Sequence, residues 1–157
     1  MQIEMCNFEQ FLNAKILTLG GMSSQVRPVR QRKIVLCIDD NEDVLECEKA
    51  FLESFGYTVL TAPSGGKALE LASIHSVDVV VVDYVMPEMN GHEVAVEMRR
   101  LRPQAPIIML SGATDVPEQA MKQVDAFIAK DRLASQLLLT IAQLHEGGSM
   151  PRLSYDA

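Results

Sequence analysis

The sequence predicts an α/β fold, a doubly wound sheet of five parallel strands between two layers of helices. From Lys33 onward, short β-branched runs alternate with longer segments of helical period, which is typical of parallel α/β sheets. The run Val79–Val82 contains no polar residue, so both faces of this strand are expected to be buried at the centre of the sheet. The 157 residues suffice for one domain with a proper core.

The first two strands flank a helix with clear ends. Residues 33–38 (KIVLCI) form a buried strand, and Asn41 can cap a helix that runs through Phe55. Gly56 ends this helix, and residues 57–62 (YTVLTA) form the second strand. The apolar stripe of the helix consists of Val44, Phe51, Leu52 and Phe55.

The next elements surround the valine strand. A helix is predicted over 64–74, before the strand 79–82. The following helix, 92–101, ends before Pro103, because a residue that precedes proline is disfavoured in a helix. Residues 106–111 (PIIMLS) form the fourth strand.

The last elements complete the sheet. Pro117 opens a short helix to about residue 123, and residues 125–129 (DAFIA) form the fifth strand. Asp131 is expected to cap a final helix that ends near Leu144. Crossovers in such sheets are right-handed, which gives a sandwich of three layers.

The predicted domain covers residues 33–146. Residues 1–32 are expected to form an extension and linker that can be partly helical, because apolar residues recur at helical spacing over 8–19. That stripe is either a docking helix or a translated upstream region, and a start at Met22 would remove it. Residues 147–157 are expected to be a disordered tail.

Composition excludes several function classes. The net charge of −7 argues against direct binding of nucleic acid, which requires clustered Lys and Arg. Three cysteines without CxxC spacing suit a reducing compartment. No apolar run reaches the roughly 18 residues of a membrane span, and the N-terminus lacks the features of an export signal. We therefore expect a cytoplasmic protein that does not insert into membranes.

Polar residues follow four of the predicted strands. Asp39 and Asp40 follow the first, Asp83 the third, Ser111 the fourth and Lys130 the fifth. Carboxyl ends of parallel strands meet at one edge of the sheet, where ligands bind in such folds. The clustered carboxylates favour a Mg²⁺ site, with Asp40 and Asp83 as ligands and Asp39 acting through a water molecule.

A carboxylate beside Mg²⁺ can attack a phosphoryl group and form an acyl phosphate, provided that donors compensate the charge on the phosphoryl oxygens. Lys130 and the Ser111 hydroxyl are the predicted donors. Backbone N–H groups that follow Asp83 and Ser111 could complete the cradle, and Gly112 would allow a close approach.

Four motifs in order, CIDD, VVVVDYVMPEMNG, IIMLSG and FIAK, resemble the receiver domain of two-component response regulators. The resemblance covers roughly residues 33–145 and implies the flavodoxin-like strand order 2-1-3-4-5 of the chemotaxis regulators. It implies that Asp83 accepts a phosphoryl group from a histidine kinase or a histidine phosphotransfer protein, with Mg²⁺ held by Asp39, Asp40, Asp83 and the backbone carbonyl of Val85.

The resemblance also implies how the signal is passed on. Val85 and Gly112 would line the phosphoryl cradle, and Ser111 and Phe127 would rearrange on phosphorylation, although Phe127 is equally well a plain core residue. The chain would then be a stand-alone receiver that catalyses only its own phosphorylation and dephosphorylation. Its kinase, downstream protein and oligomeric state are not specified by the sequence.

Two departures from the family pattern stand out. Asp131 follows the lysine where the family usually has proline, often after a cis bond; a cis bond before another residue costs about 3 kcal/mol. The resemblance therefore does not predict the geometry of this loop. The helical segment between Ser111 and Phe127 is also shorter than usual and lacks the common Gly-Ala before the fifth strand.

Other readings share parts of this pattern. Asp39 and Asp40 could simply cap a helix if they stood alone. A flavodoxin-like binder of small molecules should have a Gly/Ser/Thr-rich phosphate loop after the first strand, and an aspartyl-phosphate hydrolase usually has its nucleophile there and a cap domain. A degenerate receiver would dock partners without phosphate, which the retained acids and Lys130 disfavour.

Overall fold

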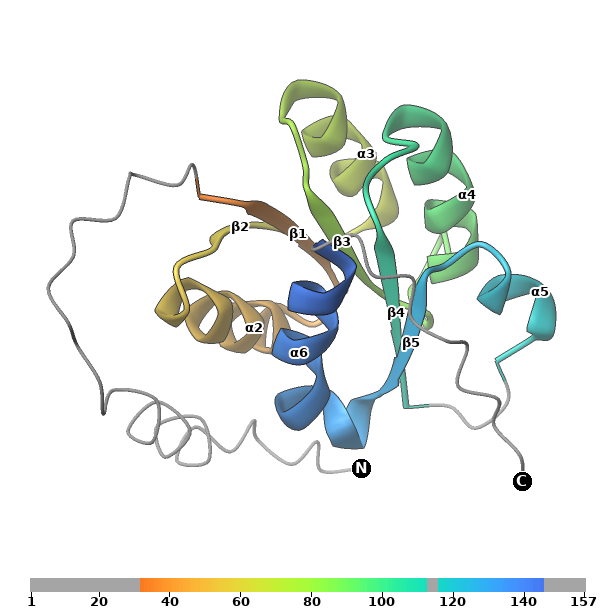
Figure 1. Ribbon diagram of the computed structural model, residues 1–157. Coiled ribbons are helices and arrows are strands. Elements are labelled where there is room, and N and C mark those ends of the chain that lie inside the picture. Colours follow the sequence, from red (N-terminus) through yellow and green to blue (C-terminus); the bar gives the residue numbers. More distant parts are fainter. Residues whose placement is uncertain (1–31, 113–115, 146–157) are drawn as a thin grey trace, which may run out of the picture.

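The computed structural model describes residues 32–112 and 116–145. Five parallel strands form one sheet in the order β2-β1-β3-β4-β5, with helices on both faces (Figure 1). The predicted fold class and strand order are confirmed. The expected N-terminal extension, with its helical stripe, and the expected C-terminal tail lie outside the described residues, as does the segment 113–115.

The elements follow one another as alternating strands and helices. The strands are β1 (Ile34–Ile38), β2 (Thr58–Ala62), β3 (Val79–Asp83), β4 (Ile107–Ser111) and β5 (Ala126–Ala129). The helices are α2 (Glu42–Ser54), α3 (Gly65–Ile74), α4 (Gly91–Leu101), α5 (Glu118–Met121), the 3₁₀ helix η1 (Lys130–Arg132) and α6 (Leu133–His145). None of the helices in the described ranges is long and apolar enough to cross a membrane.

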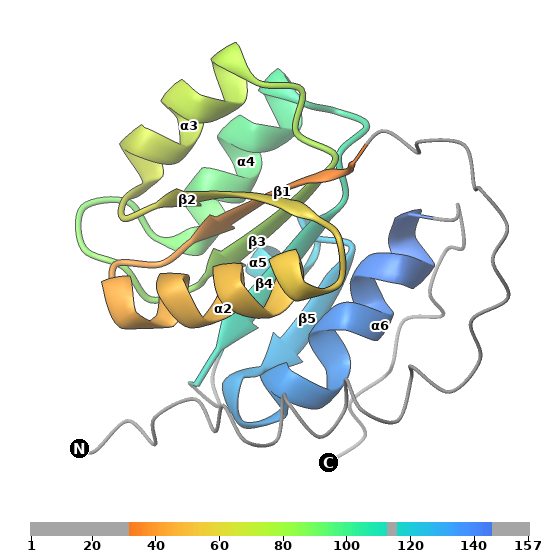
Figure 2. The same ribbon diagram turned by 90° about the vertical axis from the view of Figure 1, so that its left-hand side faces the viewer.

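Strand β3 lies between β1 and β4 at the centre of the sheet and is buried along its whole length. Side chains of a strand alternate between its two faces, and the four valines accordingly divide between two cores. Val80 and Val82 pack in the core beneath α3 and α4, whereas Val79 and Val81 pack in the core beneath α2 and α6. These two pairs of helices lie on opposite faces of the sheet (Figure 2). This double burial explains why the strand needs an unbroken apolar run.

Polar side chains fix the helix starts. Asn41 accepts hydrogen bonds from the backbone N–H groups of Asp43 and Val44, as predicted for the cap of α2. Asn90 forms a capping box with Glu93 at the start of α4, so the turn after Asp83 leads directly into that helix. These caps fix where the loops at the carboxyl edge of the sheet end.

The prediction that Asp131 caps the last helix is wrong. Asp131 lies inside η1, and α6 begins only at Leu133. The chain leaves β5 in a tight 3₁₀ turn, and Lys130, the first residue of this turn, extends its side chain toward Asp39 and Asp83 at the edge of the sheet. The described residues contain no cis peptide bond, so the bond between Lys130 and Asp131 is trans.

Candidate functional site

The polar residues predicted at the strand ends do meet at one edge of the sheet. Asp39 directly follows β1, Asp83 ends β3, Ser111 ends β4, and Lys130 directly follows β5. Asp39, Asp83 and Ser111 are almost completely buried. Strands β1, β3 and β4 are neighbours in parallel register, which places their last residues side by side.

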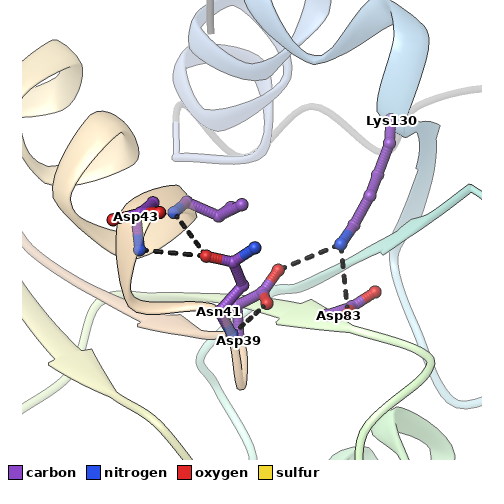
Figure 3. Close-up of polar contacts among 6 residues, drawn as sticks. Asp39, Asn41, Asp43, Asp83 and Lys130 are labelled. Carbon is purple, nitrogen blue, oxygen red and sulfur yellow. Dashed lines mark hydrogen bonds and ion pairs between the residues drawn. The ribbon is translucent and has the colours of Figure 1, made fainter. Parts of the chain in front are cut away.

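Lys130 joins two of the acids (Figure 3). Its Nζ atom donates to Asp39 Oδ2 at 3.0 Å and lies 3.1 Å from Asp83 Oδ2. The two carboxylate side chains are 2% and 6% exposed, whereas the lysine side chain is 32% exposed and reaches in from η1. The ammonium group therefore neutralises part of the negative charge that the sheet edge buries.

Three carboxylates of the site can share a cation. Asp39, Asp40 and Asp83 each offer an oxygen atom, and these atoms lie within 4.8 Å of one another. Both oxygens of Asp39 already accept a hydrogen bond, one from Lys130 and the other from the backbone N–H of Asn41 at 2.9 Å. Asp40 is exposed, which makes its carboxylate the most accessible of the three to a cation and its water ligands. An all-oxygen donor set with access to water fits Mg²⁺.

The buried charges perturb one another. Burial raises the pKa of Asp83, and the negative Asp39 adds to this, while Lys130 and a hydrogen bond from the backbone N–H of Val85 lower it; the net shift is upward. Burial alone would lower the pKa of Lys130, but Asp39 and Asp83 outweigh burial and raise it. Lys130 therefore carries its positive charge throughout the neutral range.

The remaining predicted site residues surround Asp83. The Val85 side chain is 60% exposed, and its backbone N–H points back to the Asp83 carboxylate. A β-carbon added at Gly112 would meet no atom within 4 Å, so the backbone is open on this side. Phe127 is half-buried in β5, opposite Met109 of β4. The Val85 carbonyl as a metal ligand and the switch roles of Ser111 and Phe127 remain predictions.

Sequence reasoning missed two residues near the site. A β-carbon at Gly91 would lie 2.5 Å from the backbone oxygen of Asp83, so only glycine lets α4 start against the end of β3. Glu48 of α2 is 4% exposed, and the charge of Asp39 acts on its carboxyl group. Its signal in the sequence was an acidic residue in register with Leu45 and Leu52, on the buried side of the helix.

Known proteins are similar to this chain in sequence and in fold. The family model of the response regulator receiver domain matches residues 35–142. The chain is 32% identical over 113 residues to the response regulator SaeR of Staphylococcus aureus (strain USA300), covering 70% of this chain and 49% of SaeR. The chain thus spans about half the length of the curated relatives it matches.

Solved structures agree. The response regulator TrrA from Thermotoga maritima in complex with Mg²⁺-BeF superposes with a TM-score of 0.67 at 29% identity, covering 71% of this chain and 98% of TrrA. A response regulator from Burkholderia pseudomallei with a phosphorylated aspartic acid, calcium ion and citrate gives a TM-score of 0.66 at 28% identity, covering 73% of this chain and 70% of that protein.

The family model covers more than half of the chain, and the matched range 35–142 includes the three acids Asp39, Asp40 and Asp83. Proteins of this kind are signalling domains of two-component systems rather than classical enzymes. The chain belongs to the response regulator receiver domain family.

Proposed function

We propose that Asp83 accepts a phosphoryl group from a histidine kinase or a histidine phosphotransfer protein, with Mg²⁺ bound at Asp40 and Asp83. One observation carries this proposal: Lys130 bridges Asp39 and Asp83 at the carboxyl edge of the sheet, beside an exposed third acid. Residues 33–146 are the proposed unit, and its matched part spans 35–142.

In the proposed reaction, a carboxylate oxygen of Asp83 attacks the phosphorus of the donor. The oxygen–phosphorus bond forms as the donor's nitrogen–phosphorus bond breaks, and the imidazole leaves with the electron pair. Bound Mg²⁺ would supply positive charge to the phosphoryl oxygens. Lys130 would turn its ammonium group from Asp83 toward the transferred group, while the Ser111 hydroxyl and the N–H groups of Val85 and Gly112 donate to its other oxygens.

Two solved relatives support this chemistry. The TrrA structure carries Mg²⁺-BeF, and the Burkholderia pseudomallei structure carries a phosphorylated aspartic acid. The match covers 49% of SaeR, so SaeR supports the receiver alone and no output is carried over from it. We propose that the output is a phosphorylation-dependent rearrangement of Ser111 and Phe127 that a downstream protein reads. The cytoplasmic location stays a prediction.

Intact mass after incubation with acetyl phosphate tests the proposal. We expect one phosphate per chain, only with Mg²⁺, and none in Asp83→Asn. Asp43→Asn is the matched control, because Asp43 is an exposed acid of the same edge outside the cluster. It should be phosphorylated as the wild type is. Phosphate on the Asp83→Asn protein in an acid-stable, serine-like linkage would show a hydroxyl acceptor and refute the assignment.

A further inference from the structure

Glu48 is a buried acid that the proposed reaction does not use. It lies on the inner face of α2 and is 4% exposed, among apolar residues of the core beneath α2 and α6. Its Oε1 atom has no hydrogen-bond partner among the described residues. A buried carboxylate without full hydrogen bonding is costly, whereas a neutral carboxylic acid is tolerated far better.

Polar groups face Glu48 from three elements. β1 contributes Cys37, whose thiol hydrogen-bonds to the Glu48 carboxyl group. Asp39, which directly follows β1, Asp83 of β3 and Lys130 of η1 act on Glu48 through their charges. Strand β2 and residues 133–144 of α6 carry no titratable side chain. None of the described ion pairs joins Glu48 to Lys130, and none of the described hydrogen bonds joins it to the three acids of the site. These groups therefore act on Glu48 through the electric field.

The charges around Glu48 determine its protonation. Burial, followed by the negative charge of Asp39, raises the pKa of Glu48 to about 8, against smaller opposing effects of Cys37 and Lys130. Burial also raises the pKa of Cys37 well above its ordinary value, so the thiol keeps its proton. At neutral pH the protonated Glu48 therefore lies beside a site with three acids, Asp39, Asp40 and Asp83, and one ammonium group, that of Lys130.

We propose that Glu48 is a proton-exchanging residue of the acidic site. It holds a proton while no metal ion is bound there, and it releases this proton to solvent when a divalent cation binds. This inference rests on the cation site of the proposed function. A divalent ion at Asp40 and Asp83 would offset the net negative formal charge that the three acids and Lys130 carry together, and a less negative field favours the carboxylate form of Glu48.

Thermodynamic linkage makes the effect reciprocal. If cation binding expels a proton, raising the pH must strengthen cation binding, by at most 10-fold per pH unit for one proton. The structure thus assigns to this receiver a Mg²⁺ affinity that depends on pH in the neutral range through a residue that never touches the ion. Glu48 affects cation binding through its charge and is not itself a ligand of the ion.

Calorimetric titration of the full chain with Mg²⁺, in buffers of different ionisation enthalpy, counts the released protons. At pH 7 we expect the wild type to release a substantial fraction of one proton per Mg²⁺, and Glu48→Gln to release markedly less. From pH 6 to 8 the wild-type affinity should rise several-fold more than that of the variant. Glu46→Gln, an exposed acid on the same helix, is the matched control and should behave as the wild type.

Equal proton release and equal pH dependence in the wild type and Glu48→Gln would overturn the inference while leaving the cation site intact. Failure of the wild type to bind Mg²⁺ would overturn both the site and the inference, and Asp40→Asn, which should weaken binding, separates the two cases. If Glu48→Gln does not fold, Glu48→Met replaces it. The infrared carbonyl band of a protonated carboxylic acid, which should diminish in the wild type on adding Mg²⁺, is the independent measurement.

Discussion

Gly91 couples the start of α4 to the end of β3, and replacing it by alanine should disturb the phosphorylation site directly. A β-carbon at this position would lie 2.5 Å from the backbone oxygen of Asp83 and 2.8 Å from Tyr84 Cα. Both atoms belong to the backbone, so no rotamer change relieves the overlap. The N–H of Gly91 also donates to the Tyr84 carbonyl at 2.9 Å, which ties the two segments together.

Two other glycines provide a graded comparison. A β-carbon at Gly65 would meet Met89 Sδ and Val94 Cγ2 at 2.8 Å, and the flexible methionine can move, whereas one at Gly66 would meet nothing within 4 Å. Gly66→Ala should stabilise the domain by about 0.5–1 kcal/mol. Gly91→Ala should lower the free energy of unfolding by about 1–3 kcal/mol through steric overlap. The stability of Gly65→Ala should lie between those of Gly66→Ala and Gly91→Ala.

Urea unfolding measures the free energies, and phosphate incorporation from acetyl phosphate measures the site. We expect Gly91→Ala to phosphorylate at least several-fold more slowly, because a displacement near 1 Å at a reacting group can cost about 100-fold. Gly66→Ala should keep the wild-type rate. A Gly91→Ala protein with both wild-type stability and wild-type rate would refute the claim that this contact holds Asp83 in place.

Three further predictions concern charge and water. Lys130→Ala should slow phosphorylation strongly, while Ser111→Ala keeps more of the chemistry and blunts the fluorescence or NMR response near Phe127; equal losses would contradict this division. Because the pKa of Glu48 is raised to about 8 in the folded state, its stabilising contribution is complete below the unfolded value near 4.5 and is lost as pH rises toward 8. As pH rises, the free energy of unfolding of the wild type should therefore fall relative to that of Glu48→Gln, by at most about 1.4 kcal/mol per pH unit. Urea unfolding at several pH values measures this difference, and parallel pH profiles of the two proteins would contradict the prediction. Val85→Asn should shorten the acyl-phosphate lifetime, by up to about 100-fold, because an exposed amide can orient a water molecule; phosphate release after donor removal measures this, and an unchanged lifetime would place the control of water elsewhere.

Much of the fold and of the candidate site could be predicted from the sequence, because local patterns carry that information. The run Val79–Val82 specified a strand buried on both faces, and Asn41 specified the start of a helix. The parallel arrangement then required Asp39, Asp83 and Lys130 to share one edge of the sheet, as they do. Each of these predictions depends on strand geometry and on the order of the elements along the chain. None of them requires the details of side-chain packing.

The loop after β5 could not be predicted in this way. Asp131 has the residue type of a helix cap, yet the chain forms a 3₁₀ turn there and α6 begins at Leu133. In this turn Lys130 reaches two buried carboxylates, at 3.0 Å from Asp39 and 3.1 Å from Asp83. A capping preference is weak and local, and tertiary contacts commonly override it. A local pattern does not contain the attraction of acids that lie far away in the sequence.

The sequence alone thus determined the sheet, its polar edge and the residue types gathered there, since those follow from periodicity and topology. Only the tertiary structure decided the protonation of Glu48 and the need for glycine at position 91. The pKa of an acid depends on what covers it and which charges face it, and Asp39, Asp83 and Lys130 come from three different elements. The close approach of Gly91 to Asp83 likewise depends on where α4 packs. Desolvation and steric contact are properties of the assembled core.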